Sequence, residues 1–568
     1  MQLTSTLRQR KSGVAPCSNV RSDPAVDLDD RCTTSANGTV KTAPGKGAPP
    51  AKRMTQAGGF AVAFLWFVLL NLFALWARQR TPPFLPASAP PHIFSGQRAL
   101  DRVAGLCGSF RYVGTLALHQ ATQELAKQVQ ELKELAEHFS KDRFVFEYDV
   151  QRVDGSFALN IRSFHDLLIA QSYESITNIA IRIYPRELGP DARTLVVNSH
   201  YDTAAGSPGC VDATAAIGTM MEMVSGLVHA YDDETCAQDP EHMKACAERQ
   251  LTHPVVFLLN GAEEVFLVGA HGFVTKHPYM DATSLLLNLE ASGASGPALL
   301  FRCGPGHGWM ARTYAKAVPL PHASCASQDI MNLDLFPAET DHRVFVEYGG
   351  LSGFDIASYE NGYVYHTKYD NLENAGRGFI QHLGETATSL MTELVGKNAA
   401  IEMNGMSDHR AQERMVFFDI FGLFTVVYSM QFAWYLNVAT CLAVLAVVTM
   451  RTKRAVKGCS PPVHLLQCFF FGIALLLACA GTGSIAGLLL RYVARRPLAW
   501  YGLENEWLMI PLFAFPACTV LLVLVDAFVG ARWSWILLNS CNKSLWSFAL
   551  CVVPYLRRRI SAWRTFLC

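Results

Sequence analysis

The sequence predicts an α/β fold with a mainly parallel central sheet flanked by helices, together with hydrophobic segments long enough to cross a membrane. Between residues 195 and 301, short apolar runs such as Leu-Val-Val and Val-Val-Phe-Leu-Leu alternate with helical stretches. This order is typical of a parallel sheet with helices on both faces. Polar residues follow the runs where each expected strand ends, and long apolar segments lie outside this region.

The composition divides the chain into soluble and membrane parts. Its 568 residues are 50% hydrophobic with a formal net charge of zero, and the mean hydropathy is +0.17. A chain of this length and hydrophobic content is too long and too apolar to be one ordinary soluble domain. The balanced charge argues against a nucleic-acid partner. The long apolar segments instead predict that the chain is embedded in a lipid bilayer.

The amino-terminal region is expected to be a tail followed by a membrane span. Residues 1–57 are rich in Ser, Thr, Pro and Gly without a periodic apolar face, which predicts a disordered cytosolic tail. Residues 58–77 carry no charged side chain over about 20 positions, enough to cross a membrane as a helix. A cleaved signal peptide is the alternative, but this segment begins far from Met1 and has a longer apolar core. Residues 78–97 are expected to be a Pro-rich linker.

Residues 98–400 are expected to form the soluble domain. Apolar positions three and four residues apart predict an amphipathic helix over residues 116–139. Residues 143–150 and 176–184 alternate or run apolar, as strands do. A further helix is expected from about residue 213 to 230, after the first strand of the parallel series.

The region after the soluble domain returns to a membrane-like composition. Residues 401–432 are expected to be a linker with an interfacial helix at Met415–Tyr428, because that apolar stretch is short. Residues 433–530 are expected to hold three membrane helices, and residues 531–568 a basic tail. Basic side chains crowd the loop at 451–457 and follow the last span, which places both in the cytosol and the soluble domain in the lumen.

Candidate metal ligands follow the expected strands. They are His200 with Asp202, Asp212, the pair Glu263-Glu264, Glu290 and His366. Because the carboxyl ends of parallel strands meet at one edge of a sheet, these side chains are expected to converge. Zinc takes imidazole nitrogen and carboxylate oxygen, and two ions ~3.5 to 4 Å apart need one bridging carboxylate. The sequence therefore predicts a two-zinc site in which one glutamate of the pair binds metal and the other stays free as a base.

Several short motifs occur in an order that resembles a known family. NSHYDT, SPGCVD, NGAEE, NLEASG and YHTKYD are similar to motifs of the di-zinc peptidase family that includes bacterial leucyl aminopeptidases, glutamate carboxypeptidase and glutaminyl cyclase. NGAEE with HGF, ENGYVYHTKYD and the flanking membrane segments resemble the endoplasmic reticulum metallopeptidase (felix-ina) type. The resemblance extends from Phe110 to Leu394 and implies the zinc exopeptidase fold.

The resemblance also implies a ligand set. One zinc is expected on His200 and Glu290 and the other on Glu264 and His366, with Asp212 as the bridge.

Three further residues are expected to act beside the ligands. The resemblance implies that Glu263 is the general base and that Asp202 orients the ring of His200. Tyr365, next to His366, is the expected donor to the oxyanion of the tetrahedral intermediate.

The sequence departs from the family beside the expected bridge. Val211 and Ala213 flank Asp212, where the family commonly has Asn or Asp, so hydrogen-bond support for Asp212 is an open question. Cys210 replaces a small residue close to the metals; a buried, inert thiol is expected, with a thiolate ligand as the alternative.

Two other features carry expectations. Cys236 and Cys246 lie in one acidic insertion and are expected to form a disulfide if the domain is in the oxidising lumen. Thr340-Asp341-His342 resembles a family loop near the site, with a surface turn as the alternative.

These observations predict a membrane-anchored, multi-pass zinc aminopeptidase of the endoplasmic reticulum that hydrolyses peptides in the lumen. One alternative is a catalytically inactive membrane scaffold with the same fold. Another is a glutaminyl-cyclase-like enzyme, which tends to keep one zinc rather than two.

Overall fold

The computed structural model of the chain describes residues 56–78, 80–140, 142–161, 167–238, 240–306, 308–333, 338–398, 400–403, 414–455 and 461–493. The expected tail at 1–57, the end of the 433–530 region and the basic tail at 531–568 lie largely or wholly outside these residues.

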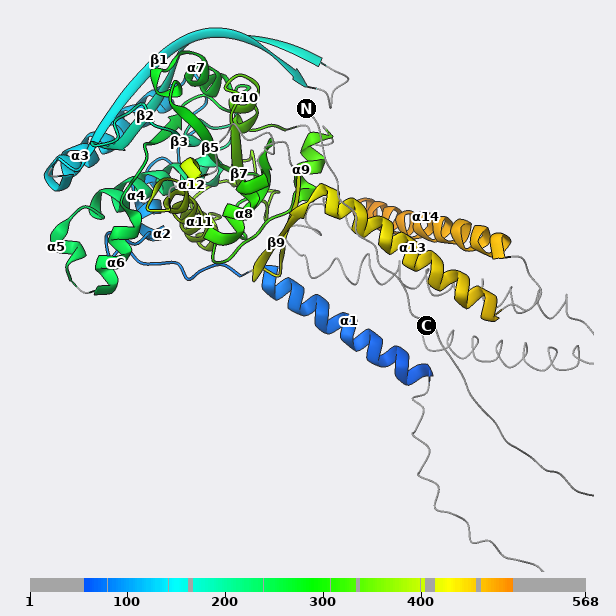
Figure 1. Cartoon of the computed structure of the whole chain (residues 1–568). Helices are drawn as coiled ribbons and strands as arrows, with labels where there is room; N and C mark the ends of the chain where they lie inside the picture. Colours follow the sequence, from blue (N-terminus) through cyan, green and yellow to red (C-terminus); the bar gives the residue numbers. More distant parts are fainter. Residues whose placement is uncertain are drawn as a thin grey trace, which may run out of the picture. The chain divides into compact units, whose positions relative to one another are not determined.

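A seven-stranded mixed sheet forms the centre of the soluble domain, in the order β1-β2-β4-β3-β5-β7-β6 (Figure 1). Its strands are β1 (Phe144–Ile161), β2 (Leu167–Pro185), β3 (Thr194–His200), β4 (Val255–Asn260), β5 (Thr283–Ala291), β6 (Leu299–Gly304) and β7 (Ser352–Ser358). The central strands β4, β3, β5 and β7 are parallel to one another. β1, β2 and β6 add antiparallel edges. The expected α/β fold with a parallel central sheet is confirmed.

The central strands are covered on both faces, which explains their continuous apolar runs. Every residue of β3 and β4 is buried. Parallel strands between two helical layers carry such runs because both sides of the strand face the core. Successive side chains point to opposite faces, so Val196 belongs to one core cluster and Val197 to the other.

Helices form the layers on either side of the sheet (Figure 1). On one face lie α7 (Val268–Lys276) and α10 (Asp341–Glu347), which share a core cluster with Val196. On the other face lie α3 (Leu116–Ser140), α4 (Ala216–His229) and α11 (Arg377–Val395), clustered with Val197. The remaining short elements of the domain are α2 (Gly96–Val103), η2 (Cys210–Ala215), α5 (Asp233–Cys236), α6 (Pro240–Arg249), η3 (Pro278–Met280), α8 (Gly308–Ala317), α9 (Cys325–Asn332) and α12 (Ala400–Met403).

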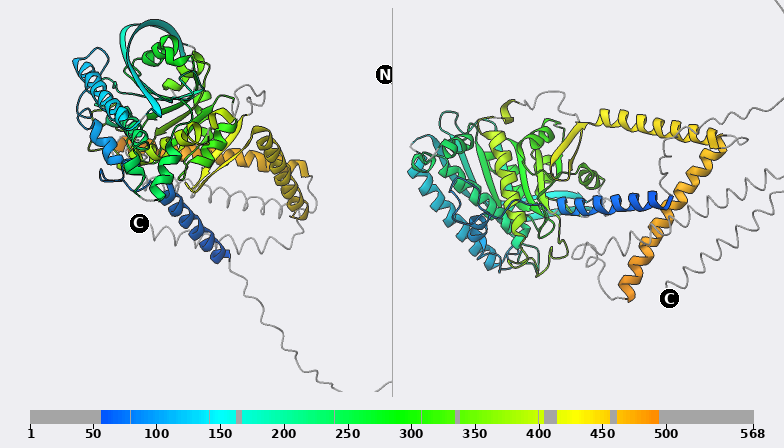
Figure 2. Two further views of the ribbon diagram at one scale, coloured as in Figure 1. Left: turned by 60° about the vertical axis from the view of Figure 1, so that its left-hand side comes forward. Right: turned by 90° about the horizontal axis from the view of Figure 1, so that it is seen from below.

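The elements expected before the parallel series are present. α3 coincides with the expected amphipathic helix and buries Ala121, Leu125 and Val129 along one side. The strands expected at 143–150 and 176–184 lie inside β1 and β2, which are much longer than expected. Together they form a strongly curved hairpin that arches over α7 (Figure 2).

Apolar helices flank the domain in sequence. They are α1 (Gln56–Arg78), α13 (Met430–Ala455) and α14 (Pro461–Val493). Among the described residues, two stretches are long and apolar enough to cross a membrane, Met430–Val447 and Cys210–His229. The second is entirely buried and is a core element of the soluble domain, whereas only 6% of the first is buried. Membrane insertion is therefore weakly indicated by α13.

The interfacial helix expected at Met415–Tyr428 is wrong. This stretch forms an antiparallel hairpin of β8 (Met415–Ile420) and β9 (Phe424–Ser429). Phe421 and Gly422 have positive φ angles of 54° and 64°, the conformation of a tight hairpin turn that matches strand twist. The Asp419 carboxylate accepts a hydrogen bond from the Gly422 backbone N–H at 2.9 Å and secures the turn. The aromatic and β-branched residues on either side suit strands better than a helix.

Candidate metal centre

The candidate ligands lie at one edge of the sheet, where the parallel strands end. His200 is the last residue of β3, and Glu290 is the penultimate residue of β5. The Glu263-Glu264 pair follows β4. Asp212 lies in η2, in the connection from β3 to α4, and His366 lies in the loop after β7. Neighbouring parallel strands thus bring distant side chains together, as expected.

Asp212 lies between the two imidazoles. Its Oδ1 is 3.4 Å from His200 Nε2, and its Oδ2 is 3.1 Å from His366 Nε2. Each oxygen of one buried carboxylate therefore faces a different histidine. This is the arrangement that a carboxylate bridging two metal ions requires.

Each imidazole also has a second carboxylate. His200 Nε2 is 3.5 Å from Glu290 Oε2, and His366 Nε2 is 3.2 Å from Glu264 Oε2. The ligand atoms of His200, Asp212 and Glu290 all lie within 4.8 Å of one another, as do those of Asp212, Glu264 and His366. Two three-residue groups thus share Asp212, and a third joins His200 to Glu263 and Glu264.

The electrostatics of the cluster favour a bound cation. Burial raises the pKa of Glu290 to about 7. Burial also raises the pKa of Glu263 well above its usual value, against the opposing charge of His200. Burial works against the charged form of His366, but hydrogen bonds with Asp212 and Glu264 raise its pKa to about 10. Crowded carboxylates that retain protons are stabilised when a metal ion supplies positive charge, so the donor set and its charge fit zinc.

Asp202 supports three members of the cluster from behind. Its Oδ1 is 3.3 Å from His200 Nδ1, the ring nitrogen that faces away from Asp212. Its two carboxylate oxygens also accept hydrogen bonds from the backbone N–H groups of Glu263 at 2.9 Å and Glu264 at 3.0 Å. Asp202 therefore fixes both the ring of His200 and the turn that carries the glutamate pair.

Tyr365 stacks on His366, with ring centroids 3.7 Å apart. Burial, followed by the negative charges of Asp212 and Glu264, raises the pKa of its phenol. The phenol therefore stays protonated at neutral pH and keeps its hydrogen-bond donor.

The support of Asp212 comes from a residue that the sequence did not single out. The Asp370 carboxylate accepts hydrogen bonds from the backbone N–H groups of Val211 at 2.8 Å and Asp212 at 3.1 Å. Backbone donors do not depend on side-chain identity, so the apolar neighbours of Asp212 leave its support intact. Asp370 closes the YHTKYD motif, which was the available signal.

Asp341 is buried beneath the cluster and does not lie in a surface turn. Its Oδ2 accepts hydrogen bonds from Asn198 at 2.9 Å and Asn260 at 2.7 Å. Asn198 also donates to Asn288 on β5, which donates to Asp355 on β7. Polar residues of β3, β4, β5 and β7 thus form a hydrogen-bonded layer with Asp341. The signal in the sequence is the asparagine in each apolar run of β3, β4 and β5, together with Asp355 in β7.

Two disulfides change the interpretation of the cysteines. Cys210 is bonded to Cys107, so the expected buried thiol is wrong. The error arose because the two residues are 103 positions apart in sequence and only the fold brings them together. The expected disulfide between Cys236 and Cys246 is confirmed.

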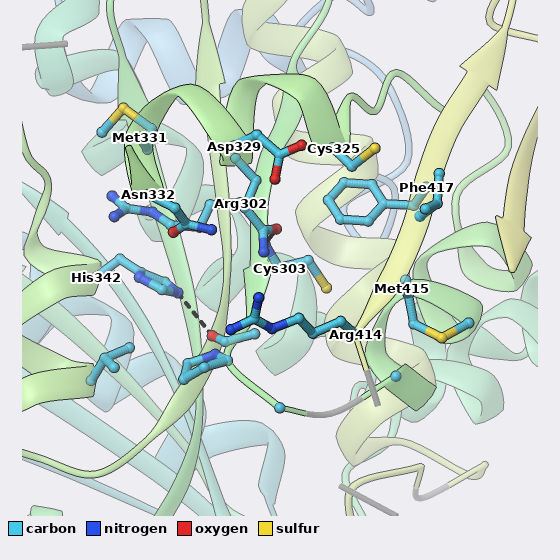
Figure 3. A pocket seen from close by; sticks show the side chains of 18 of the residues that line it. Arg302, Cys303, Cys325, Asp329, Met331, Asn332, His342, Arg414, Met415 and Phe417 are labelled. Atoms are coloured by element: carbon cyan, nitrogen blue, oxygen red, sulfur yellow. Dashed lines mark hydrogen bonds between the residues drawn. The ribbon is translucent and has the colours of Figure 1, made fainter. Parts of the chain in front are cut away.

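A cavity of about 720 Å³ lies beside β6, α9 and α10 and contains none of the candidate ligands. Figure 3 shows Arg302, Cys303 and Arg414 on its wall. Arg302 forms an ion pair with Asp355 at 3.0 Å, which connects this wall to the polar layer under the cluster. The clustered side chains that could hold a metal ion lie elsewhere, so this cavity is not the candidate reaction site.

Comparison with known proteins identifies several relatives. The putative endoplasmic reticulum metallopeptidase 1-A of Caenorhabditis elegans is 36% identical over 307 residues, which cover 54% of this chain and 32% of the relative. The endoplasmic reticulum metallopeptidase 1 of Homo sapiens is 30% identical over 356 residues, covering 62% of this chain and 36% of the relative. The chain thus matches about a third of the length of these relatives.

A solved structure and a family model also match. The zinc aminopeptidase BSAP from Bacillus subtilis superposes with a TM-score of 0.37 at 13% identity, over 56% of this chain and 97% of that one. Residues 178–391 match the model described as Peptidase family M28. Every candidate ligand and Glu263 fall inside that range. The chain therefore contains a domain of peptidase family M28.

Proposed function

We propose that this chain is a membrane-anchored zinc aminopeptidase that hydrolyses peptides in the endoplasmic reticulum lumen. The observation that carries the proposal is the position of Asp212, whose two oxygens face His200 and His366 while each histidine has its own glutamate. The names of the relatives support a metallopeptidase of an internal membrane.

The ligand assignment takes the two groups that contain Asp212, because Glu290 lies closer than Glu263 to His200 Nε2, at 3.5 Å against 3.9 Å. His200, Asp212 and Glu290 would hold one zinc, and Asp212, Glu264 and His366 the other. Two zinc ions bound in this way would lower the pKa of the attacking water and polarise the scissile carbonyl.

Glu263 is the group that moves the proton. Its Oε2 is 3.9 Å from His200 Nε2, beside the cluster, and its backbone is fixed by Asp202. Burial raises the pKa of its carboxyl group, and the positive charge of bound zinc would act in the opposite direction and favour the carboxylate that a base requires. From this position Glu263 would take the proton of the attacking water and deliver it to the leaving amine. The neutral phenol of Tyr365 donates to the oxyanion that forms between these steps.

The substitution E263Q tests this assignment. It preserves size and removes the base, so we expect zinc content near that of the wild type and turnover lower by about 100-fold or more. Zinc per chain is measured by elemental analysis of the purified protein, and turnover on a panel of aminoacyl fluorogenic substrates. H200A and H366A provide the contrast, since both should lower bound zinc.

The outcomes separate the alternatives. Wild-type hydrolysis by E263Q would refute the role of Glu263. One zinc per chain together with cyclisation of amino-terminal glutamine would favour the cyclase, and wild-type protein without zinc or hydrolysis would favour the inactive scaffold.

A further inference from the structure

Arg111 is a buried side chain that contacts the loops carrying two of the candidate ligands, and it lies before residues 178–391, which the family model matches. Its Nε donates a hydrogen bond to the backbone oxygen of Tyr201 at 2.9 Å, one residue after His200. Its backbone N–H donates to Thr203 Oγ1 at 3.0 Å, and its carbonyl accepts from Thr203 N at 3.2 Å. Arg111 thus holds the chain that leaves β3 directly after the first candidate ligand.

The same guanidinium reaches the segment that carries Asp212. Arg111 Nη2 donates to the backbone oxygen of Gly209 at 3.3 Å and also to the hydroxyl of Thr214. The Thr214 hydroxyl in turn donates to Gly209 O. These contacts lie on either side of Asp212, so one side chain connects both ligand-bearing segments.

The charge of Arg111 matches its surroundings. Burial lowers its pKa to about 10, while the negative charges of Asp202 and Asp370 act in the opposite direction. It therefore remains a cation at neutral pH. Asp202 supports His200 and Asp370 supports Asp212, so Arg111 balances the two carboxylates behind the candidate ligands.

A covalent bond fixes the same region. The Cys107–Cys210 disulfide is buried and ends two residues before Asp212. Cys107 lies between α2 and Arg111, and α2 packs tightly on α4, where a Cβ on Gly218 would come within 2.3 Å of the Ala99 oxygen. The segment at 106–111 is therefore anchored to the body of the domain and to the Asp212 segment together.

We propose that Arg111 and the Cys107–Cys210 disulfide form a mount that holds Asp212 at a fixed distance from His200, and that this mount sets the zinc affinity of the site. The inference rests on the proposed function, because it takes Asp212 and His200 as zinc ligands. Arg111 and the two cysteines are positioning residues: their contacts run through the loops and not to the metal or the substrate. The functional unit then begins before residue 178, where the family match starts.

The two disulfides provide a matched comparison. C107S/C210S removes the covalent part of the mount. C236S/C246S removes the disulfide of the α5–α6 insertion, which lies between α4 and β4 and carries none of the candidate ligands. The full-length proteins are stripped with a chelator, and zinc affinity is measured by competition with a chromogenic chelator. We expect C107S/C210S to bind zinc about 10- to 100-fold more weakly, and C236S/C246S to match the wild type.

A second readout distinguishes positioning from general stability. Loss of either disulfide lowers the unfolding temperature of the zinc-free protein, but only loss of the mount should reduce the rise in unfolding temperature that added zinc produces. Excess zinc should restore hydrolysis by C107S/C210S, because its base and ligands are intact.

R111K tests the other half of the mount. Lysine keeps the charge and loses the planar fork that joins Tyr201, Gly209 and Thr214, so zinc affinity should fall by about tenfold or more. R249K is the control, since Arg249 donates to His92 O outside the metal centre. If C107S/C210S does not fold, R111K and R249K decide the question by the same readouts.

The results identify which proposal fails. Equal zinc affinity in the wild type, C107S/C210S and R111K would overturn the mount and leave the proposed function intact, as would equal losses in C107S/C210S and C236S/C246S. Wild-type protein that binds no zinc would overturn the proposed function itself.

Discussion

Asp202 performs several tasks with one carboxylate, which makes it a sensitive residue of the centre. It faces His200 Nδ1 and accepts the N–H groups of Glu263 and Glu264, and its side chain is completely buried. A carboxylate behind a metal-binding histidine fixes the tautomer and raises the basicity of the ligand. Here the same group also orients the proposed base and one proposed ligand.

We expect D202A to weaken zinc binding by about 10- to 100-fold, since His200 loses its orienting partner and two backbone N–H groups lose their acceptor. Chelator competition on the purified protein measures this directly. D154A is the control: Asp154 accepts a backbone hydrogen bond from Ser175 on the exposed β1–β2 hairpin and should leave zinc binding unchanged. Unchanged affinity in D202A would contradict the role given to Asp202.

At the residue scale, the sequence predicted the candidate ligands better than the residues that hold them in place. His200, Asp212 and His366 were predictable because metal ligands belong to few residue types and follow strand ends. The support of Asp212 was not predictable, because Asp370 acts on backbone N–H groups that every residue possesses. The partner of Cys210 was not predictable either, because it lies 103 residues away.

At the scale of elements, the strands of the parallel series were predictable because burial on both faces leaves a continuous apolar run. The β8–β9 hairpin was not, since its apolar residues are also compatible with a helix lying on a membrane. The local turn decides between them: Phe421 and Gly422 adopt left-handed φ angles that end one strand and start the next. The turn conformation of these two residues therefore accompanies a hairpin, although the composition of the stretch would also suit a helix.

His382 shows how helix α11 is docked and predicts an effect of pH. The Ala298 N–H donates to its Nδ1 at 2.8 Å, and its Nε2 is 2.7 Å from the Leu320 oxygen, so the ring is neutral in the fold. Burial lowers its pKa to about 4, with the nearby His322 as a smaller contribution. Between pH 6.5 and 4 the unfolded chain therefore binds a proton that the folded domain excludes. Stability should fall as the pH falls through this window.

H382Q should remove part of this pH dependence. We expect the wild-type domain to lose up to about 3 kcal/mol through His382 between pH 6.5 and 4, and H382Q to show a shallower loss. The free energy of unfolding is measured on chelator-treated protein, so that acid release of metal does not contribute. H119Q, which changes an exposed histidine of α3, is the control. Equal slopes in the wild type and H382Q would contradict the prediction.

At the scale of the whole molecule, the proposal depends on which side of the membrane holds the domain. The basic loop at 451–457 and the basic residues after 531 favour the cytosol for both. The Cys107–Cys210 and Cys236–Cys246 disulfides independently favour an oxidising compartment for the domain. The basic residues and the disulfides lie in different parts of the chain, and both support an orientation with the domain in the lumen.

Glycosylation tests this orientation because the modification occurs only in the lumen. The natural acceptor sequences at Asn37 and Asn542 lie in the two regions expected in the cytosol, so the wild-type chain should carry no glycan. The double substitution L188N/P190T creates an acceptor in the exposed turn between β2 and β3, where Leu188 is 47% exposed. We expect this variant alone to migrate more slowly in a gel and to return to the wild-type position after endoglycosidase treatment. Protease added to sealed microsomes should leave its domain intact. A glycan at Asn37, or digestion of the domain from outside, would place the M28 domain in the cytosol, where the two disulfides would be reduced and the mount of Asp212 would lose its covalent part.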